Sequence, residues 1–419
     1  MDTDGAPSDL ADEFLVRCWA AGGGEESFVE ECSKGMFEIN TPPSGTLAAL
    51  TPQYLESLNL ALRVGREMGV RLYPLAAYPL SMSPPMRDDP SYELQAHTLG
   101  RGKFLHAGRC IGTHLHLEIC EGTIDPATVV SENASPAARK ELLNLYNLAV
   151  ALDPAIIALT RSSPFYEGEA PGLAVRTARY RGSAAFGWQG LYADLPEVGG
   201  LKPYAATTEQ VVEQHRSDYG VWLEALAEAG VEERIYTGSG GGPLKANWGP
   251  VRISGKNTIE LRGIDGNYPQ PTLAVAALIE AAANRLRETE LTVTPTEGLS
   301  EIQVDGDRLL VPDYQTVSKH LFHAAVTEGV ANPAIVTYLD SLVAFATAET
   351  TPDYLKTLKP DGAHYHATEA AILEDFPADE PLSREDGLRL VRESCDRLEE
   401  QVSSLLRNTE SDEAPLHPV

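Results

Sequence analysis

The sequence predicts an α+β protein with a mainly antiparallel sheet. Helix-like and strand-like segments follow one another irregularly, whereas a parallel sheet requires a regular alternation of strands and helices. The composition, with 43% hydrophobic and 22% charged residues, is that of a folded globular chain. Because no Pro- or Ser-rich linker and no internal repeat divides the chain, we expect one domain over residues 1–407. Its helical C-terminal part should cover about 313–407, and residues 408–419 should be a disordered tail.

Six segments carry apolar residues at helical spacing. One of them begins at Thr51, a capping residue, with Pro52 at the first helical position. The predicted helices cover about 51–69, 136–152, 207–229, 270–288, 313–349 and 383–407. Between them, short strand-like runs predict β-structure around 36–41, 71–75, 111–119, 251–262 and 302–311.

The chain is strongly acidic, with 61 Asp and Glu against 33 Lys and Arg and a formal net charge of -28. Nucleic acid is therefore not an expected partner, because binding to a phosphate backbone requires basic surface. Only nine of the basic residues are lysine, and an acidic, lysine-poor surface resembles that of halophilic proteins, which work in concentrated salt. An ordinary acidic cytosolic protein is the alternative.

The halophilic interpretation predicts how folding stability depends on salt. Added KCl screens the repulsion among the acidic side chains, so the melting temperature should rise between low salt and molar KCl. Calorimetric melting in a series of KCl concentrations measures this dependence. A melting temperature that stays flat or falls would leave the ordinary acidic protein as the explanation.

The sequence predicts a cytoplasmic protein with no membrane partner. No apolar run approaches the roughly 18 residues of a membrane span. The start, MDTDGAPSDLADE, is acidic where a signal peptide would be basic and then apolar. The five cysteines are scattered and form no C-x-x-C pair, which predicts reduced, structural thiols. If the chain assembles, a symmetric homo-oligomer is expected.

The stretch GTHLHLEI at residues 112–119 places polar side chains at alternate positions. On a strand, His114, His116 and Glu118 share one face, and the intervening apolar residues share the other. An ordinary half-exposed strand would show the same pattern. Two further runs repeat it, MFEIN with Glu38 and Asn40, and NTIELRGID with Thr258, Glu260 and Arg262.

A sheet concave on this polar side would gather carboxylates and imidazoles into one site. Carboxylate oxygens with few imidazoles suit Mg²⁺ or Mn²⁺, and an H-x-H pair with carboxylates also suits Zn²⁺. Arginines supply the opposite charge, because Arg252 and Arg262 flank Glu260 and Arg176 follows in GLAVRTARYRG. Guanidinium groups bind carboxylates and phosphates in pairs of hydrogen bonds, which indicates phosphate chemistry. Surface ion pairs are the alternative, above all for Arg179 and Arg181.

Other motifs are weaker candidates. The glycine-rich segment 237–245 lacks the ending of a phosphate-binding loop, so a flexible lid before Trp248 is favoured over a phosphate cradle. The histidines of HYH, residues 364–366, are interpreted as incidental. Cys110 and Cys120 bracket the histidine strand and are interpreted as packing residues.

Four motifs occur in a fixed order: MFEINTPPSGTL, GTHLHLEI, ALTRSSPFYEG and NWGPVRISGKNTIELRGID. Together they resemble the second glutamate-cysteine ligase family, which includes the bacterial carboxylate-amine ligases, from about residue 10 to about 350. The resemblance implies a glutamine-synthetase-like fold, an antiparallel sheet curled into a half-open barrel with helices outside and Mg²⁺ and ATP within. It also implies the reaction, in which ATP phosphorylates the side-chain carboxylate of glutamate and an amine displaces the phosphate.

The resemblance assigns roles to particular residues. The implied metal ligands are Glu13 from an N-terminal strand, Glu38, His114 and Glu260. Arg262 would stabilise the charge on the transferred phosphoryl group, and Glu260 and Arg252 complete the catalytic set. Nucleotide or substrate binding falls to Asn40, Thr41, His116, Arg176 and Trp248.

The first strand departs from the family pattern. The family reads G-x-E-x-E-F, whereas DLADEFLV places Ala11 at the position of the first acid. Either Asp9 or Asp12 substitutes for the missing ligand, or the protein binds fewer metals. The loop between this segment and MFEINTPP is also short, which affects the expected glutamate pocket.

These observations predict an ATP- and Mg²⁺- or Mn²⁺-dependent ligase that joins the γ-carboxylate of glutamate, or a similar acid, to an amine. Cysteine is the first choice of amine, which would place the reaction in glutathione biosynthesis. One alternative is a zinc-dependent amide hydrolase built on His114, His116 and Glu260. The other is a degenerate family member that binds a metabolite without catalysis, an alternative kept open by Ala11.

Overall fold

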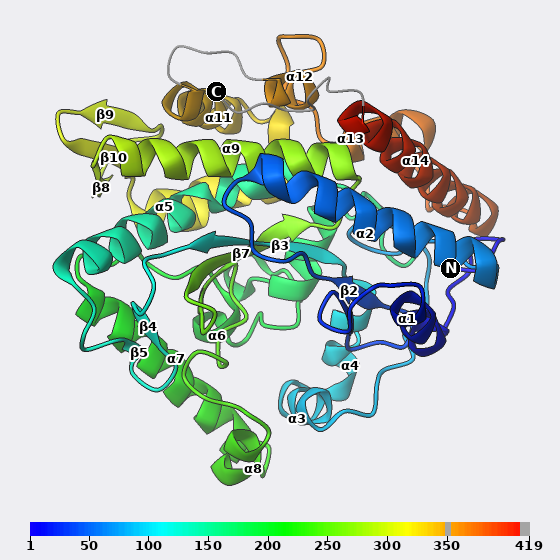
Figure 1. Ribbon diagram of the computed structural model, residues 1–419, viewed down its shortest axis with the longest axis horizontal. Helices are drawn as coiled ribbons and strands as arrows, with labels where there is room; N and C mark the ends of the chain where they lie inside the picture. The colour runs from blue at the N-terminus through cyan, green and yellow to red at the C-terminus, as the bar shows by residue number, and fades with distance from the viewer. Residues whose placement is uncertain (348–352, 411–419) are drawn as a thin grey trace.

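The computed structural model describes residues 1–347 and 353–410 and has the predicted mixture of helices and antiparallel sheet. In Figure 1 three long helices cross one side of a small central sheet: α2 (Leu47–Met68), α5 (Pro136–Thr160) and α9 (Pro269–Glu288). Other helices lie on the other side of the sheet in this view: α3 (Pro90–Leu99), α4 (Arg101–Phe104), α6 (Pro196–Gly199), α7 (Thr208–Glu228) and α8 (Glu233–Gly238).

The central sheet has the strand order β3-β7-β6, and both pairings are antiparallel. Its strands are β3 (Gly112–Glu118), β7 (Thr258–Asp265) and β6 (Val251–Ser254). They confirm the strands predicted at 111–119 and 251–262. Because His116 and Arg252 are both direct partners of Glu260 in the register, the polar residues of all three strands meet on one face.

The remaining strands form three separate small sheets. In the described part of the chain they are β1 (Phe28–Glu30) with β2 (Phe37–Ile39), β4 (Ile124–Asp125) with β5 (Val129–Val130), and β8 (Thr292–Thr296), β10 (Arg308–Pro312) and β9 (Gln303–Asp305). Only β8 and β10 pair in parallel among these strands. The described strands do not close into a barrel, so the half-open barrel stays a prediction.

Helix α5 packs against the apolar face of the central sheet, opposite the polar side chains. The hydroxyl oxygen of Ser135 accepts a hydrogen bond from Ala138 N, and Pro136 occupies the first turn, so the helix begins where the sequence predicts. It continues eight residues beyond the predicted end, to Thr160. Its apolar content would suit a membrane span by length and composition, but 94% of that window is buried within the protein, which makes it a core helix.

The C-terminal part is helical, as predicted, but the segment expected to be helical over 313–349 is interrupted. A π-helical turn (Thr316–Leu321), α10 (Phe322–Thr327), a 3-10 turn (Gly329–Ala331) and α11 (Pro333–Thr347) follow one another. Gly329 has a positive φ and Pro333 has no backbone N–H, so the helix cannot run through them. Three further helices complete this part: α12 (Tyr354–Leu358), α13 (Thr368–Asp375) and α14 (Arg384–Glu410).

Two predicted strands are wrong. Residues Ala11–Ala20 form helix α1, because Phe14, Leu15 and Cys18 recur at helical spacing and pack in one cluster with residues of α2. Residues 71–75 are not assigned to a strand. The nearby backbone N–H groups of Ala76 and Ala77 donate instead to side-chain hydroxyl groups. The predicted tail begins within α14, which reaches Glu410, and its remainder, 411–419, lies outside the described residues.

Candidate active site

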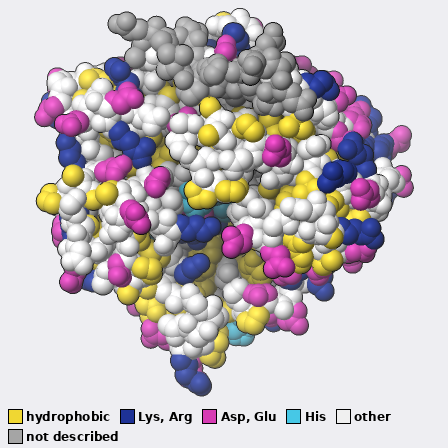
Figure 2. Space-filling view, in the orientation of Figure 1, with side chains coloured by type: hydrophobic (Ala, Val, Ile, Leu, Met, Phe, Trp, Pro, Cys, Tyr) yellow, Lys and Arg dark blue, Asp and Glu magenta, His cyan; other side chains and the backbone are white. Residues whose placement is uncertain are grey.

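The polar face of the central sheet contains a β-bulge at its centre. Between the pairs Thr113 to Ile264 and Leu115 to Leu261, two residues of β7, Arg262 and Gly263, oppose the single residue His114 of β3. A bulge changes the direction of nearby side chains and is common beside functional sites. Figure 2 shows basic and histidine side chains together in a hollow near the middle of this face, over β3 and β7 in Figure 1.

Glu260 lies between two arginines at the centre of this face. Its side chain is only 2% exposed, and Arg252 Nε donates to Oε2 at 2.8 Å while Arg262 Nη1 donates to Oε1 at 2.6 Å. Burial alone would raise the pKa of Glu260, but the charges of Arg262 and Arg252 outweigh it and hold the pKa at about 2. The carboxylate therefore stays ionised at any working pH and fixes both guanidinium groups.

His114 adjoins this arrangement, and His116 lies at its edge. His114 Nδ1 is 3.4 Å from Glu260 Oε1 and 3.5 Å from Arg262 Nη1. Burial and the charge of Arg262 lower the pKa of His114 well below its usual range, so the imidazole is neutral, the form that can bind a metal. His116 is exposed, and its Nδ1 shares a hydrogen bond with Thr258 Oγ1 at 2.7 Å.

Arg176 comes to the same face from the loop after α5. Its Nη2 donates to the backbone oxygen of Arg262 at 2.9 Å, and its Nη1 is 3.9 Å from Asp265 Oδ1. A Cβ atom built on Gly112 would lie 2.2 Å from Arg176 Nη2. The glycine at the start of GTHLHLEI therefore leaves room for this guanidinium group to reach the sheet.

This close approach predicts that Gly112→Ala will displace Arg176 and leave the fold intact. The φ of Gly112 is not positive, so alanine fits its backbone, and the conflict falls on the flexible end of an arginine. We expect the KM of a substrate bound by Arg176 to rise by about tenfold, the effect of about 1.4 kcal/mol. Steady-state kinetics with a melting curve measure both effects.

The matched control is Gly45→Ala, at a position with a compatible backbone and no other atom within 4 Å of the built Cβ. It should leave both KM and melting temperature unchanged. Unaltered kinetics in Gly112→Ala would show that the position of Arg176 does not matter for binding.

A pair of carboxyl groups lies on the β1–β2 hairpin beside the central sheet. Val29 is the direct cross-strand partner of Glu38, and Glu31 follows two residues later, so Glu31 and Glu38 project from the same side. The two carboxyl groups are within hydrogen-bonding reach of one another. Burial and the charge of Glu31 raise the pKa of Glu38 to about 7, although Arg262 opposes the shift.

The carboxylate pair fits a hard divalent cation. Mg²⁺ in phosphoryl-transfer sites is commonly bound by one or two carboxylates together with substrate phosphates. Glu31 and Glu38 supply two such groups, which repel one another when both are ionised. Among residues 1–347 and 353–410, no three His, Cys, Asp or Glu side chains form a metal-holding group, so the predicted convergence of Glu38, His114 and Glu260 on one point is not found.

Glu13 is not part of this arrangement. It lies on α1, is half exposed, and forms an ion pair with Arg17 one helical turn away. Asp12, one of the two acids considered as a substitute at Ala11, forms an ion pair with the buried Arg87. Asp9 is exposed on the segment before α1. Glu31 is therefore the additional acid near Glu38.

The other predicted binding residues lie at the periphery. Asn40 and Thr41 follow β2 and are half-buried, and the backbone N–H of Asn40 donates to Ser27 O. Trp248 stacks on Tyr192 with ring centroids 5.6 Å apart, so it belongs to the aromatic cluster around α7. The glycine-rich segment before it turns around the ring of Tyr236. Ligand roles for these residues stay predictions.

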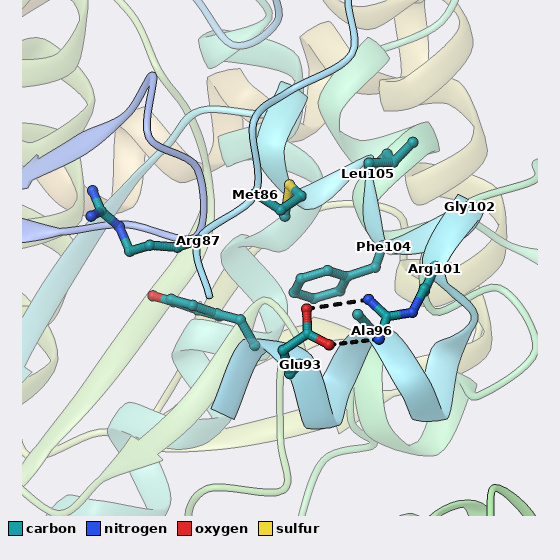
Figure 3. Close-up of a pocket in the computed structure, with 9 residues that line it drawn as sticks. Met86, Arg87, Glu93, Ala96, Arg101, Gly102, Phe104 and Leu105 are labelled. Carbon is teal, nitrogen blue, oxygen red and sulfur yellow. Dashed lines mark hydrogen bonds and ion pairs between the residues drawn. The ribbon is translucent and has the colours of Figure 1, made fainter. Parts of the chain in front are cut away.

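A small, mainly apolar cavity of about 290 Å³ lies around α3 and α4 (Figure 3). Its wall contains Met86, Arg87, Tyr92, Glu93, Ala96, Arg101, Gly102, Phe104 and Leu105. The ion pair of Glu93 and Arg101 lies at one side of it, and the guanidinium of Arg87 points away. Burial raises the pKa of Tyr92 in this wall, and the charge of Glu31 adds to the shift.

The family model of glutamate-cysteine ligase family 2 matches residues 3–321 of this chain. The chain belongs to this family. A relative from Rubrobacter xylanophilus, provisionally named glutamate–cysteine ligase 2-3, is 27% identical over 279 residues. That alignment covers 65% of this chain and 63% of the relative, so the chain spans less than two thirds of the relative's length. The family resemblance inferred from the four motifs is confirmed.

Glu31 is not among the site residues predicted from the sequence, and the family match assigns it no role. The segment SFVEECSKGMFEIN has two strand-like runs separated by a short segment with a glycine, which is the signal of a hairpin. Pairing these runs would have placed Glu31 beside Glu38. The sequence places the missing family acid near Ala11, which lies on α1 and not on this hairpin.

Proposed function

We propose that this protein is an ATP-dependent ligase that joins the γ-carboxylate of glutamate, or of a similar acid, to an amine such as cysteine through an acyl phosphate. The observation that carries the proposal is the arrangement of Glu260 between Arg252 and Arg262 beside the Glu31–Glu38 pair. It combines fixed positive charge for phosphoryl oxygens with carboxylates for a hard cation. The family supports a ligase of this type.

The chain's own residues would orient and neutralise the reacting groups. Arg262 Nε is buried and has no hydrogen-bond acceptor among the described residues, so it can bind an oxygen of the transferred phosphoryl group. Arg252 and Arg176 add two guanidinium groups for the remaining phosphate or carboxylate oxygens. Glu31 and Glu38 would hold Mg²⁺, which neutralises phosphate charge and aligns the attacking oxygen when bound.

The donor arrangement favours a ligase over the zinc hydrolase. A catalytic Zn²⁺ requires three protein ligands arranged around one point, and the described residues offer no such group. His116 contacts Thr258 and lies on a different sheet from Glu38. Mg²⁺ with substrate phosphates requires only one or two carboxylates, which are present.

The raised pKa of Glu38 predicts how metal binding depends on pH. Below about 7 the Glu31–Glu38 pair retains a proton that the metal must displace, so Mn²⁺ affinity should rise about tenfold per pH unit up to pH 7 and level off above it. In Glu31→Gln the remaining carboxylate loses its like-charged neighbour, so its pKa falls. That variant should bind Mn²⁺ more weakly at pH 8 and with a smaller dependence on pH between 6 and 8, because burial still raises the pKa of Glu38.

Calorimetric titration of Mn²⁺ at pH 6, 7 and 8 measures these affinities. The control is Glu26→Gln, an exposed acid just before the same hairpin, which should behave as the unmodified protein. An affinity that does not vary with pH in the unmodified protein would count against the carboxylate pair as the metal site.

The function itself is tested by incubating the protein with ATP, Mg²⁺, glutamate and a panel of amino acids and amines. Phosphate release that requires both glutamate and one amine, with an equal amount of amide, is the expected result. Release with no acid present, or none with any pair of substrates, would contradict the proposal and favour a degenerate binding protein. A cytoplasmic location, a homo-oligomeric state, adaptation to salt and a role in glutathione biosynthesis belong to the same proposal.

A further inference from the structure

A second cavity of about 590 Å³ lies between α6, α7 and the segment before α10. It is lined by Pro196, Glu197, Leu201, Lys202, Pro203, Gln210, Glu213, Gln214, Ser217, Asp218 and Tyr314. None of these residues belongs to the polar face of the central sheet. The cavity is therefore outside the candidate active site and has a wall of its own.

The cavity wall contains a buried pair of opposite charges. Lys202 and Asp218 have side chains only 5% and 6% exposed, and Lys202 Nζ lies 2.6 Å from Asp218 Oδ1. Beyond this ion pair, Nζ has no other acceptor among the described residues, and Asp218 Oδ2 has no donor. Leaving such groups unsatisfied is costly, so both atoms are available to a ligand that supplies partners.

The charges around this pair are unbalanced. Glu197 and Glu213 are exposed at the rim, so three carboxylates face one ammonium group. Burial raises the pKa of Asp218 to about 6, against the effect of Lys202, so at neutral pH Asp218 is ionised. Gln214 is already engaged, since its Oε1 accepts from Tyr146 and its Nε2 donates to Pro203 O. The unsatisfied groups are therefore the charged ones.

We propose that this cavity binds a free amino acid, with the α-ammonium group on Asp218 Oδ2 and the α-carboxylate on Lys202 Nζ. A zwitterion satisfies both atoms of the buried pair at once, whereas a simple anion or cation would leave one of them unpaired. The two rim carboxylates favour an amino acid with a cationic side chain over one with an acidic side chain. The site does not depend on the ligase reaction.

L-arginine is the probe for this site, titrated calorimetrically into the full-length protein at pH 7.5 without nucleotide. We expect saturable binding of one molecule per chain. Agmatine, which lacks the carboxylate, and N-acetyl-L-arginine, which lacks the ammonium group, should each bind at least tenfold more weakly, because each leaves a buried charge unpaired. Equal binding of all three compounds would overturn the proposal.

The variant that removes the site is the double substitution Lys202→Met with Asp218→Leu. Replacing both members of a buried ion pair by apolar residues of similar size is nearly neutral for folding, whereas replacing one would leave a buried charge. The double variant should melt within a few degrees of the unmodified protein and bind L-arginine at least tenfold more weakly. Unchanged affinity for L-arginine in a folded double variant would exclude this cavity as the binding site.

Two further variants locate the binding. Glu213→Gln should weaken L-arginine severalfold and leave L-leucine unchanged, because the rim charge acts only on a cationic side chain. Arg262→Lys, which alters the candidate active site, should bind L-arginine as the unmodified protein does. Loss of binding in Arg262→Lys together with normal binding in the double variant would assign the ligand to the active site and contradict the proposal.

Discussion

Glu260→Gln should reduce ADP formation by about 100-fold or more, the effect of losing a preorganised electrostatic group. The substitution keeps the size of the side chain but removes the charge that fixes Arg252 and Arg262. Both guanidinium groups then lose the counter-ion that directs them toward the substrate. Because the pKa of Glu260 is about 2, the carboxylate is ionised throughout the assay range, and no choice of pH will mimic or hide the effect.

The same substitution should also lower folding stability, since removing one partner of a buried ion pair costs about 3–5 kcal/mol. Activity must therefore be compared well below the melting temperature of the variant. Glu260→Asp separates positioning from folding, because it retains the charge with a shorter reach and should recover part of kcat. Glu118→Gln, an exposed residue on the neighbouring strand, is the control and should be fully active. Normal ADP formation by folded Glu260→Gln would show that catalysis does not need the charge of Glu260.

Glu369→Gln should cause a large loss of folding stability, although Glu369 lies outside the candidate active site. Arg161, directly after α5, binds Glu369 of α13 through two hydrogen bonds, from Nε at 2.9 Å and from Nη2 at 2.5 Å. The two side chains are only 6% and 10% exposed. Arg161 Nη1 also donates to Val326 O, so this contact joins the core helix to two C-terminal segments.

We expect Glu369→Gln to lower the free energy of unfolding by about 3–5 kcal/mol. At about 2.1 cal/mol/K of unfolding entropy per residue, this corresponds to roughly 3–6 °C in the melting temperature of a chain this long. The control is Glu93→Gln, which removes a similar bidentate pair with Arg101 at an exposed position and should change stability much less, because solvent screens an exposed pair. Equal losses in the two variants would show that burial does not strengthen the Arg161 contact.

The helices and strands that could be predicted are those with strong local signals. Helix α5 has a capping serine, a proline in its first turn and a continuous apolar run. Strand β3 alternates polar and apolar residues, and the buried Leu117 between the exposed His116 and Glu118 confirms that pattern. For the N-terminal segment the family pattern predicts a strand, but the helical spacing of Phe14, Leu15 and Cys18 decides the structure, which is helix α1.

The candidate site was only partly predictable for a related reason. Alternation along one strand places Glu260 and Arg262 on a shared face, and the structure brings them together with His114, Arg176 and Arg252. Cross-strand contacts depend on register, and the bulge opposite His114 has no clear signal in the sequence. Glu260 is engaged by two arginines, whereas Glu31 and Glu38 form no ion pair with a described residue, and this difference emerges only from the packed structure.

Isotope transfer from glutamate to phosphate tests the ligase proposal most directly. The protein is incubated with ATP, Mg²⁺, the best amine acceptor and glutamate labelled with ¹⁸O in its γ-carboxylate, and the released phosphate is examined by mass spectrometry. An acyl phosphate carries one carboxylate oxygen to phosphorus, so each amide formed should yield one phosphate with a single ¹⁸O atom. Amide formed with unlabelled phosphate, or amide cleavage by a zinc-loaded protein without nucleotide, would contradict the account.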